Sequence, residues 1–410
     1  MSLAFETLRR AVWPIGGAAS RAPVPDRAAP ARTRIESIDL VRGVVMIMMT
    51  LDHARDFLAA GGFNPRDVTE PALFLTRWIT HFCAPTFIFL AGISAFLYGA
   101  QGRSAAESSR FLFTRGLWLV AIEFTVVRFA WTFSLHVDDL VLQVIFAIGA
   151  SMIVLSALVY LPRWTIMATG LAMIVGHNML DGVAARDLGA AAPLWNVLHQ
   201  PGVIAVAPGF RVMVLYPLIP WIGVMALGYA LGPVFLLERK LRVARLARLG
   251  AAVTAAFVLL RASNLYGDPT PWTVQDGWIA TALSFINCEK YPPSLLYLAM
   301  TLGPALLLLA AVDSPRGGLA RWLTIFGRVP FFYYVTHLLL IHALAIPVAW
   351  ATTGNAAWLF GHLSGKPAGY GMGLPGVYAA WLAVVIALAP LCAWFAAIKR
   401  RRDEWWWSYL

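Results

Sequence analysis

Long apolar runs separated by short polar connections dominate this 410-residue chain. Most runs hold about 20 residues, the length of helix that crosses a hydrocarbon core of roughly 30 Å. Strands of a membrane barrel would be shorter and would alternate apolar with polar residues, so helices are favoured. The pattern predicts an all-α, polytopic membrane bundle of about ten transmembrane helices, at residues 37–58, 73–100, 111–132, 139–161, 164–182, 212–236, 247–263, 292–312, 330–351 and 375–397.

Composition excludes an ordinary soluble domain. Apolar residues make up 60% of the chain and charged residues only 13%, whereas a soluble domain is about half apolar and about a quarter charged. The lipid bilayer is therefore the first expected partner. The three cysteines, Cys83, Cys288 and Cys392, show no metal-ligand spacing, so no metal is expected.

Lysine and arginine gather in alternate connections between the predicted helices. The densest groups, at 239–248 and 399–402, fall on the same side of a ten-helix topology. Basic connections stay in the cytoplasm, so both termini are predicted to be cytoplasmic. Residues 1–34 are predicted to be a disordered basic tail, 35–398 the bundle and 399–410 a basic, aromatic tail. The net charge of +11 is explained by these basic connections between membrane helices, so no nucleic-acid partner is expected.

Ionisable residues lie on one face of the first predicted span, "SIDLVRGVVMIMMTLDHARDFL". Such residues are costly inside a membrane and are functional candidates. Arg42 and His53 are eleven positions apart, which places them within about 20° of each other and roughly 16 Å apart along a helix. Asp39, three positions before Arg42, is placed to pair with its guanidinium. Asp52 lies beside His53 in the outer half of the span.

The second predicted span, "LTRWITHFCAPTFIFLAGISAFL", carries two more candidates. Arg77 and His81 are four positions apart and share a face. His81 is expected at a depth similar to that of Asp52 and His53, so the histidines and the aspartate are predicted to converge. Pro85 removes a backbone hydrogen bond beside His81 and is expected to kink the helix there.

Each candidate also has a simpler explanation. Arg42 could be a snorkelling anchor or a topology determinant, His53 a hydrated residue near the outer end, and His81 a hydrogen-bonded packing residue. Because they occur together with Asp39, Asp52 and Arg77 in two adjacent spans, a functional site is favoured over separate structural roles. In later segments, "LYPLIPWIG" at 215–223 suggests a broken helix that lines a cavity, and the group at 177–181 (His177, Asn178 and Asp181) is assigned a structural role.

The chain resembles a known family. "RIESIDLVRGVVMIMMTLDHARDF", "LTRWITHFCAPTFIFLAGISAFL", "YPLIPWIGVMALGY", "KYPPSLLYLAMTLGP" and "GRVPFFYYVTHLLLIH" are similar to bacterial membrane proteins grouped with the heparan-alpha-glucosaminide N-acetyltransferase catalytic domain. The S-x-D-x-x-R-G start and the F-x-F-L-x-G end of the second span are the most specific parts. The resemblance covers nearly all of 34–410 and implies a multi-pass protein of the bacterial inner membrane.

The resemblance also implies a transmembrane acyltransferase that takes an acyl group, acetyl first of all, from cytosolic acyl-CoA to an extracytoplasmic sugar or glycan. In the lysosomal enzyme a catalytic histidine lies between spans one and two, but residues 57–75 here contain none. His53 or His81 would therefore act as base or form an acyl-imidazole. The expected site residues are His53, His81, Asp52 and Arg77 for catalysis; Asp39, Arg42, Arg328 and Arg115 for acyl-CoA; and Tyr216, Lys290, Tyr291 and His337 for the acceptor.

Two other functions remain open at this point. The same Asp, His and Arg residues could form the proton relay of a transporter or flippase, although no internal repeat is visible. They could also be polar contacts within a membrane scaffold or sensor. A homodimer is compatible with either function and with the acyltransferase.

Overall fold

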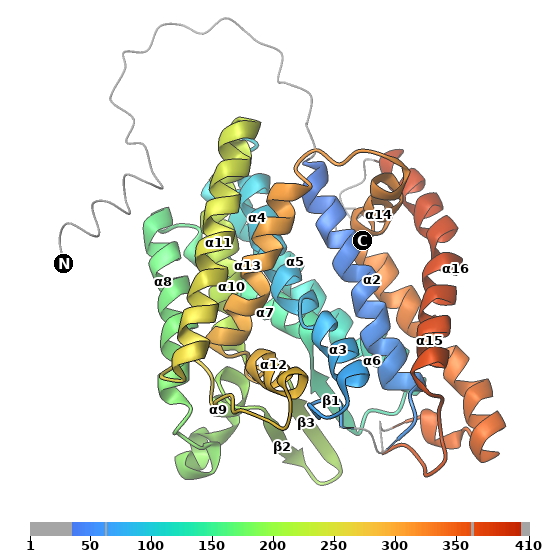
Figure 1. Cartoon of the computed structure of the whole chain (residues 1–410). Coiled ribbons are helices and arrows are strands. Elements are labelled where there is room, and N and C mark those ends of the chain that lie inside the picture. The colour runs from blue at the N-terminus through green and yellow to red at the C-terminus, as the bar shows by residue number, and fades with distance from the viewer. Residues whose placement is uncertain (1–34, 62–63, 362–364, 403–410) are drawn as a thin grey trace, which may run out of the picture. The chain divides into compact units, whose positions relative to one another are not determined.

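A computed structural model describes residues 35–61, 64–361 and 365–402. The predicted tail at 1–34 and the end of the predicted tail at 399–410 lie outside the described residues. The described chain is mostly helical, and its long helices run side by side (Figure 1). Their bounds are α2 (Glu36–Leu58), α3 (Pro71–Thr80), α4 (Cys83–Gly99), α5 (Ala105–Ile122), η1 (Glu123–Val127), α6 (Arg128–Thr132), α7 (Val144–Leu158), α8 (Arg163–Gly176), α10 (Leu218–Leu231), η4 (Gly232–Leu236), α11 (Arg239–Ser263), α13 (Leu295–Ala311), α14 (Gly318–Arg328), α15 (Pro330–Thr353) and α16 (Leu374–Arg400).

Each of the ten predicted segments contains one or more of these helices. Five helical stretches among the described residues are long and apolar enough to cross a membrane: 71–99, 218–236, 239–263, 330–353 and 374–400. A bent pair, 163–180 with 185–198, would make a sixth. The protein is thus a helical, multi-pass membrane protein, while the count of ten and the side of the termini stay predictions. The helix α2 has 23 residues but carries six charged ones, which lowers its hydropathy.

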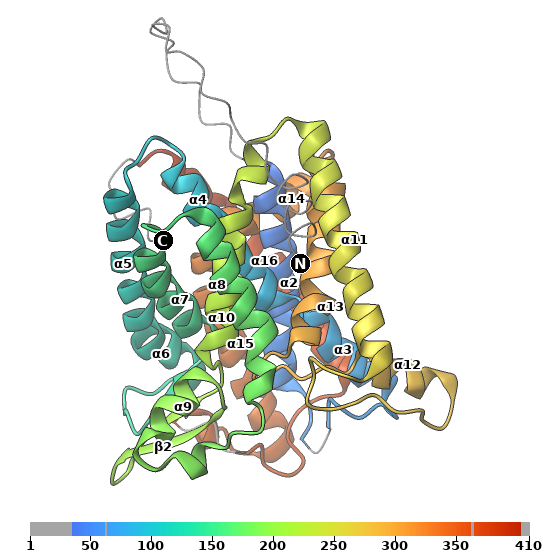
Figure 2. The ribbon, with the colours of Figure 1, turned by 90° about the vertical axis from the view of Figure 1, so that its left-hand side faces the viewer.

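The all-α prediction is wrong in one respect, because the described chain also contains a three-stranded sheet. Its strands are β1 (Asp139–Leu142), β2 (Gly202–Ala207) and β3 (Phe210–Val214), in the order β1-β3-β2. β1 pairs parallel to β3, and β2 pairs antiparallel to it. The sheet lies at the end of the bundle where α2 ends, with the short helices α9 (Ala192–Leu198) and α12 (Trp278–Ile286) at the same end (Figures 1 and 2).

The sheet corrects two predicted helix boundaries. The segments predicted as helices at 139–161 and 212–236 begin in β1 and in the last part of β3. Hydropathy alone cannot separate a short apolar strand from the apolar helix that follows it. The predicted broken helix at 215–223 is likewise wrong, because Pro217 is the N-cap residue of α10, which begins at Leu218, four positions after the last residue of β3. The segment does line a cavity, as predicted, through Leu215 and Tyr216.

The second predicted span is interrupted beside His81, as Pro85 led us to expect. α3 ends at Thr80 and α4 begins at Cys83. Proline has no N–H, so residue 85 cannot donate to the carbonyl oxygen of His81, four positions earlier. The hydroxyl of Tyr297 donates to that oxygen instead, at 2.8 Å. At this interruption the two neighbouring side chains contact different residues: Thr80 donates to Asp52, and His81 packs on the Tyr297 ring.

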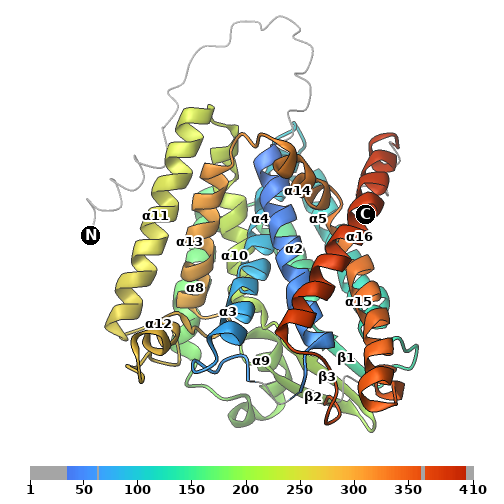
Figure 3. The ribbon, with the colours of Figure 1, turned by 45° about the vertical axis from the view of Figure 1, so that its right-hand side comes forward.

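The helix α14, which lies outside the ten predicted spans, packs against α2 (Figure 3). Glycines allow the two backbones to meet. A Cβ on Gly327 would lie 1.8 Å from the carbonyl oxygen of Asp39, and a Cβ on Gly43 would lie 2.0 Å from that of Leu323. Small residues at such contacts let membrane helices approach closely. The contact fixes the first turns of α2, where Arg42 lies.

Gly327→Ala is therefore expected to separate α2 from α14. The added methyl group would meet backbone atoms on the facing helix, and overpacking of this kind costs roughly 1–3 kcal/mol. A lower melting temperature of the detergent-purified protein would show it. Gly318→Ala is the matched control on the same helix, because a Cβ there would meet nothing within 4 Å. Equal melting temperatures for the two variants would contradict the prediction.

Candidate active site

A cavity of about 1080 Å³ follows the length of α2. Arg42, Tyr98 and Arg115 line it near the start of α2, Asp52 and His53 near the end. Its wall beyond them includes residues of the sheet and of the loops at that end of the bundle: Asp139, Val203, Arg211, Met213, Tyr216, Lys290, Tyr291 and Lys366. Ligand pockets usually measure about 300–1,000 Å³, so this volume suits a large ligand or two ligands at once.

His53 is oriented by a chain of two hydrogen bonds. Its Nδ1 lies 2.7 Å from Nε2 of His337, and Nδ1 of His337 lies 2.8 Å from the carbonyl oxygen of Tyr333. A carbonyl only accepts, so Nδ1 of His337 carries a proton and, in the neutral ring, Nε2 accepts from His53. His53 therefore carries its own proton on Nδ1. Its Nε2 is left with a lone pair in a residue that lines the cavity.

The two histidines are held by deep burial. The side chains of His337 and Tyr333 are fully buried, and His53 is 8% exposed. The rings of His53 and His337 are nearly coplanar, with an interplanar angle of 2°, and Trp131 meets the His53 ring edge-on at 5.0 Å between centroids. The Tyr333 hydroxyl is bound in turn to the Thr50 hydroxyl at 2.7 Å. These contacts leave His53 one orientation.

Asp52, next to His53 in sequence, belongs to a separate ionic group. Its Oδ1 accepts from Thr80 at 2.8 Å and pairs with Arg55 at 2.7 Å, and its Oδ2 lies 3.8 Å from Nζ of Lys290. Burial alone would lower the pKa of Lys290, but the nearby Tyr291 and Asp52 raise it above the ordinary value. Lys290 is thus a fixed cation beside the carboxylate in the cavity wall.

Arg42 is held against the other end of the wall. Its guanidinium donates to Asp39 Oδ1 at 3.3 Å, to Ser94 Oγ at 3.0 Å and to the carbonyl oxygen of Gly327 at 3.3 Å. The pairing of Asp39 with Arg42, predicted from their spacing, is confirmed. Nearby, the rings of Tyr98 and Phe111 stack with centroids 4.0 Å apart. Arg115 lies 6.0 Å from the Phe111 ring, so two arginines and two aromatic rings line this end.

The structure divides the expected site residues into three groups. Arg42, Arg115, Asp52, His53, Tyr216, Lys290 and Tyr291 line the cavity. Asp39 and His337 lie behind the wall, where they orient Arg42 and His53. The remaining three, Arg77, His81 and Arg328, are not among the residues that line it.

His81 does not join His53 in the cavity wall. It is 1% exposed, packs on the Tyr297 ring, and neither ring nitrogen has a hydrogen-bond partner among the described residues. Because the helix is interrupted after Thr80, it is the Thr80 hydroxyl that reaches Asp52. His81 thus lies within electrostatic range of Asp52 but is not among the residues that line the cavity with Asp52 and His53.

The remaining two arginines lie elsewhere. Arg77 is 8% exposed, and its backbone carbonyl oxygen accepts from the Thr80 hydroxyl at 2.7 Å. Arg328 ends α14, and its Nε is buried. Arg42 instead contacts the carbonyl group of the preceding residue, Gly327. The α14 helix thus reaches Arg42 through its backbone.

Three site residues were missed from the sequence: Arg55, Thr80 and Tyr333. Arg55 could have been found, since it lies three positions after Asp52 on one helical face. Tyr333 lies four positions before His337 on one helical face, so their proximity could also be expected from the sequence. Thr80 carries no such signal, because a threonine inside an apolar segment is an ordinary packing residue until the fold shows what it faces.

Comparison with known protein families identifies a match. A family model described as "Heparan-alpha-glucosaminide N-acetyltransferase, catalytic" matches residues 34–264, which is more than half of the chain. The match includes Arg42, Asp52, His53 and Arg115, whereas Lys290 and His337 lie beyond its end. No curated protein matches the chain.

Proposed function

The chain belongs to the heparan-alpha-glucosaminide N-acetyltransferase catalytic family, and on that premise we propose that it transfers an acyl group across a membrane. The donor is cytosolic acyl-CoA, with acetyl-CoA the first candidate. The acceptor is a hydroxyl or amine on the opposite side, first of all a sugar. The observation that supports this most is that one cavity has arginines near one end of α2 and a base, His53, near the other.

The arginine end suits the nucleotide of the donor. A planar guanidinium matches phosphate oxygens in a bidentate way that an ammonium cannot. Arg42 and Arg115 would hold the phosphates, and the stacked Tyr98 and Phe111 beside them offer an apolar surface. The pantetheine arm would then follow α2. The roughly 16 Å rise of α2 between Arg42 and His53 is of the order that such an arm covers.

His53 would act as the general base. Its Nε2 lone pair takes the proton of the acceptor hydroxyl or amine as that group attacks the thioester carbonyl. The carbonyl π bond opens to a tetrahedral oxyanion. The intermediate collapses with cleavage of the carbon–sulfur bond, and the imidazolium returns its proton to the thiolate of CoA. The products are the acylated acceptor and free CoA, and no other reactant is needed.

Lys290 replaces Arg77 as the proposed partner of the oxyanion. It lines the cavity and is held as a cation beside Asp52, whereas Arg77 does not line it. A preorganised cation aimed at developing negative charge stabilises it strongly where water is excluded. Asp52, with Arg55 and Thr80 around it, would position Lys290. The aromatic rings of Tyr216 and Tyr291, whose centroids are 5.5 Å apart, would form the acceptor wall.

The proposal is tested with purified protein in sealed proteoliposomes. Labelled acetyl-CoA is supplied on one side, and glucosamine and other amino sugars or sugars are supplied on the other. Acylated sugar on the acceptor side, with release of CoA on the donor side, is the expected result. Proton-driven uptake of a solute with no CoA binding would instead identify a transporter and overturn the proposal.

Arg42→Gln is expected to raise the KM for acetyl-CoA about 10- to 100-fold, because a hydrogen bond to a charged group contributes roughly 1.5–3 kcal/mol. The same variant should leave the KM for acetyl-pantetheine, which lacks the nucleotide phosphates, unchanged. Steady-state kinetics with both donors measures this. Arg321→Gln, an exposed arginine on α14, is the control. Equal losses with both donors would mean that Arg42 acts on the fold and does not bind phosphate.

A further inference from the structure

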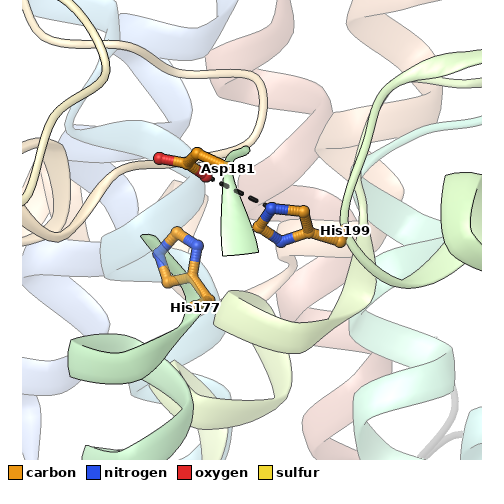
Figure 4. Close-up of side chains that lie close together, drawn as sticks. All are labelled: His177, Asp181 and His199. Atoms are coloured by element: carbon orange, nitrogen blue, oxygen red, sulfur yellow. Dashed lines mark ion pairs between the residues drawn. The ribbon is translucent and has the colours of Figure 1, made fainter. Parts of the chain in front are cut away.

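Two histidines and an aspartate meet at the end of α8, outside the cavity wall (Figure 4). His177 opens the short helix η2 (His177–Leu180), Asp181 follows it, and His199 is the C-cap residue of α9. One potential ligand atom from each residue lies within 4.8 Å of the other two. In Figure 4 both rings and the carboxylate face a common space. None of the three lines the cavity described above.

The spacing is close to that of a metal site. Nε2 of His199 lies 3.2 Å from Oδ1 of Asp181. In a tetrahedral Zn²⁺ site with bonds of about 2.0–2.1 Å, two ligand atoms lie about 3.3 Å apart. The distance between Nε2 of His199 and Oδ1 of Asp181 already matches this separation. The ligand atom of His177 lies within 4.8 Å of the other two.

The histidines lack the partners that buried polar groups normally have. His177 is 1% exposed and His199 2% exposed. Among the described residues, no hydrogen bond of good geometry reaches Nδ1 of His199 or either ring nitrogen of His177. The backbone carbonyl of Pro293 lies near the His177 ring, and it can accept from only one of the two nitrogens, so the other remains without a partner. A buried polar group without a partner costs about 1–3 kcal/mol. In a packing role these nitrogens would be satisfied, whereas a bound cation accounts for lone pairs that face one another.

A further residue orients the carboxylate, as ligands of metal sites usually require. Nδ2 of Asn178 donates to Oδ2 of Asp181 at 2.8 Å, which leaves Oδ1 facing His199. Oδ1 of Asn178 accepts from the backbone N–H of Leu295 at 2.9 Å, at the start of α13. The aspartate is therefore fixed from a second helix while its other oxygen points at the histidines.

We propose that His177, Asp181 and His199 bind a divalent transition metal ion, with Zn²⁺ as the ion that the donor set fits. Two imidazoles and one carboxylate suit zinc, while calcium and magnesium prefer oxygen ligands alone. Water would complete the tetrahedron, since Asp181 is 26% exposed in its side chain. The donor set contains no cysteine, so cysteine spacing carries no signal of it, and His199 joins the pair at 177 and 181 only through the fold.

A metal here would fix the base of the β2–β3 hairpin. His199 precedes the first residue of β2 by three positions, and α8 ends directly before His177. The hairpin contributes Val203, Arg211 and Met213 to the cavity wall. The ion would thus join α8 to the segment that enters the hairpin, and its role is structural whether or not the cavity transfers acyl groups.

The test is zinc binding by the full chain, purified without a polyhistidine tag, treated with EDTA and dialysed. Elemental analysis after addition of Zn²⁺ should give about one ion per chain, and Co²⁺ should produce the visible absorption of a tetrahedral site. His199→Gln and Asp181→Asn are expected to bind Zn²⁺ at least about tenfold more weakly. The control His136→Gln removes an exposed histidine and should bind as the parent protein does.

Thermal unfolding supplies a second measurement. Zn²⁺ should raise the melting temperature of the parent protein and of His136→Gln, because a ligand that binds only the folded state stabilises it. Asp181→Asn keeps the shape of the side chain and should fold, yet gain clearly less stability than the parent protein at the same Zn²⁺ concentration. Substoichiometric zinc in the parent protein, or equal binding by Asp181→Asn and the parent, would overturn the proposal.

Discussion

Replacement of His53 by asparagine is expected to lower kcat for acyl transfer about 10²- to 10⁴-fold, the usual contribution of a positioned general base. The ring of His53 lines the cavity, and Nε2 is the nitrogen that the hydrogen bond to His337 leaves without a proton. Asparagine has no group that accepts a proton at neutral pH. The KM for acetyl-CoA should change little, because the proposed phosphate contacts lie near the start of α2.

His136→Asn is the control for this variant, since that histidine is exposed and does not line the cavity. His81→Asn is the informative comparison. His81 is buried away from the cavity wall, so its replacement should leave kcat within a few-fold of the parent value. Full activity in His53→Asn together with loss in His81→Asn would transfer the role of base to His81 and contradict the proposed mechanism.

Replacement of His337 by leucine is expected to reduce kcat almost as strongly, by about 10²- to 10³-fold, although His337 touches no reacting atom. It positions His53 by accepting the Nδ1 proton. With a hydrocarbon in that place, the buried ring has no acceptor for its Nδ1 proton and can adopt the other tautomer, in which Nε2 carries the proton. In a catalytic triad, loss of tautomer control lowers kcat by about 10⁴, which sets the scale.

His337→Gln distinguishes positioning from packing. The amide oxygen of glutamine can accept from His53 as the imidazole did, so this variant should recover at least about tenfold of the activity that leucine loses. Nitrogen chemical shifts of labelled histidine would report the tautomer of His53 directly. Equal losses in both variants, with unchanged tautomer and lower melting temperatures, would mean that His337 serves only the packing of α2 against α15.

Contacts within one helix were predictable from the sequence. The pairing of Asp39 with Arg42 follows from a spacing of three residues. The alignment of Arg42 with His53 follows from the fixed 100° turn per residue, and both residues line one cavity. The interruption beside His81 follows from the missing N–H of Pro85. In each case the cause lies in the backbone or in neighbouring residues, so no knowledge of packing is needed.

Contacts between distant segments were not predictable. His53 and His337 are 284 positions apart, and the conjunction of Asp52 with Lys290 depends on how the loop before α13 returns to α2. The choice between His53 and His81 was left open because both lie on apolar segments of similar depth. The helix is interrupted at 81–82, and the path of the backbone there directs Thr80 to Asp52 and His81 to Tyr297. That path is a property of the folded chain.

The sequence by itself thus determined a helical membrane protein, its family resemblance and the charged face of α2, because hydropathy and helical period are local properties. The tertiary structure decided the sheet at one end of the bundle, the tautomer of His53, the cation beside Asp52 and the meeting of His177, Asp181 and His199. These depend on which surfaces pack together, and packing is settled by the shapes of residues far apart in the chain. The same apolar run can form a strand or the first turn of a helix, and only its neighbours in space select one.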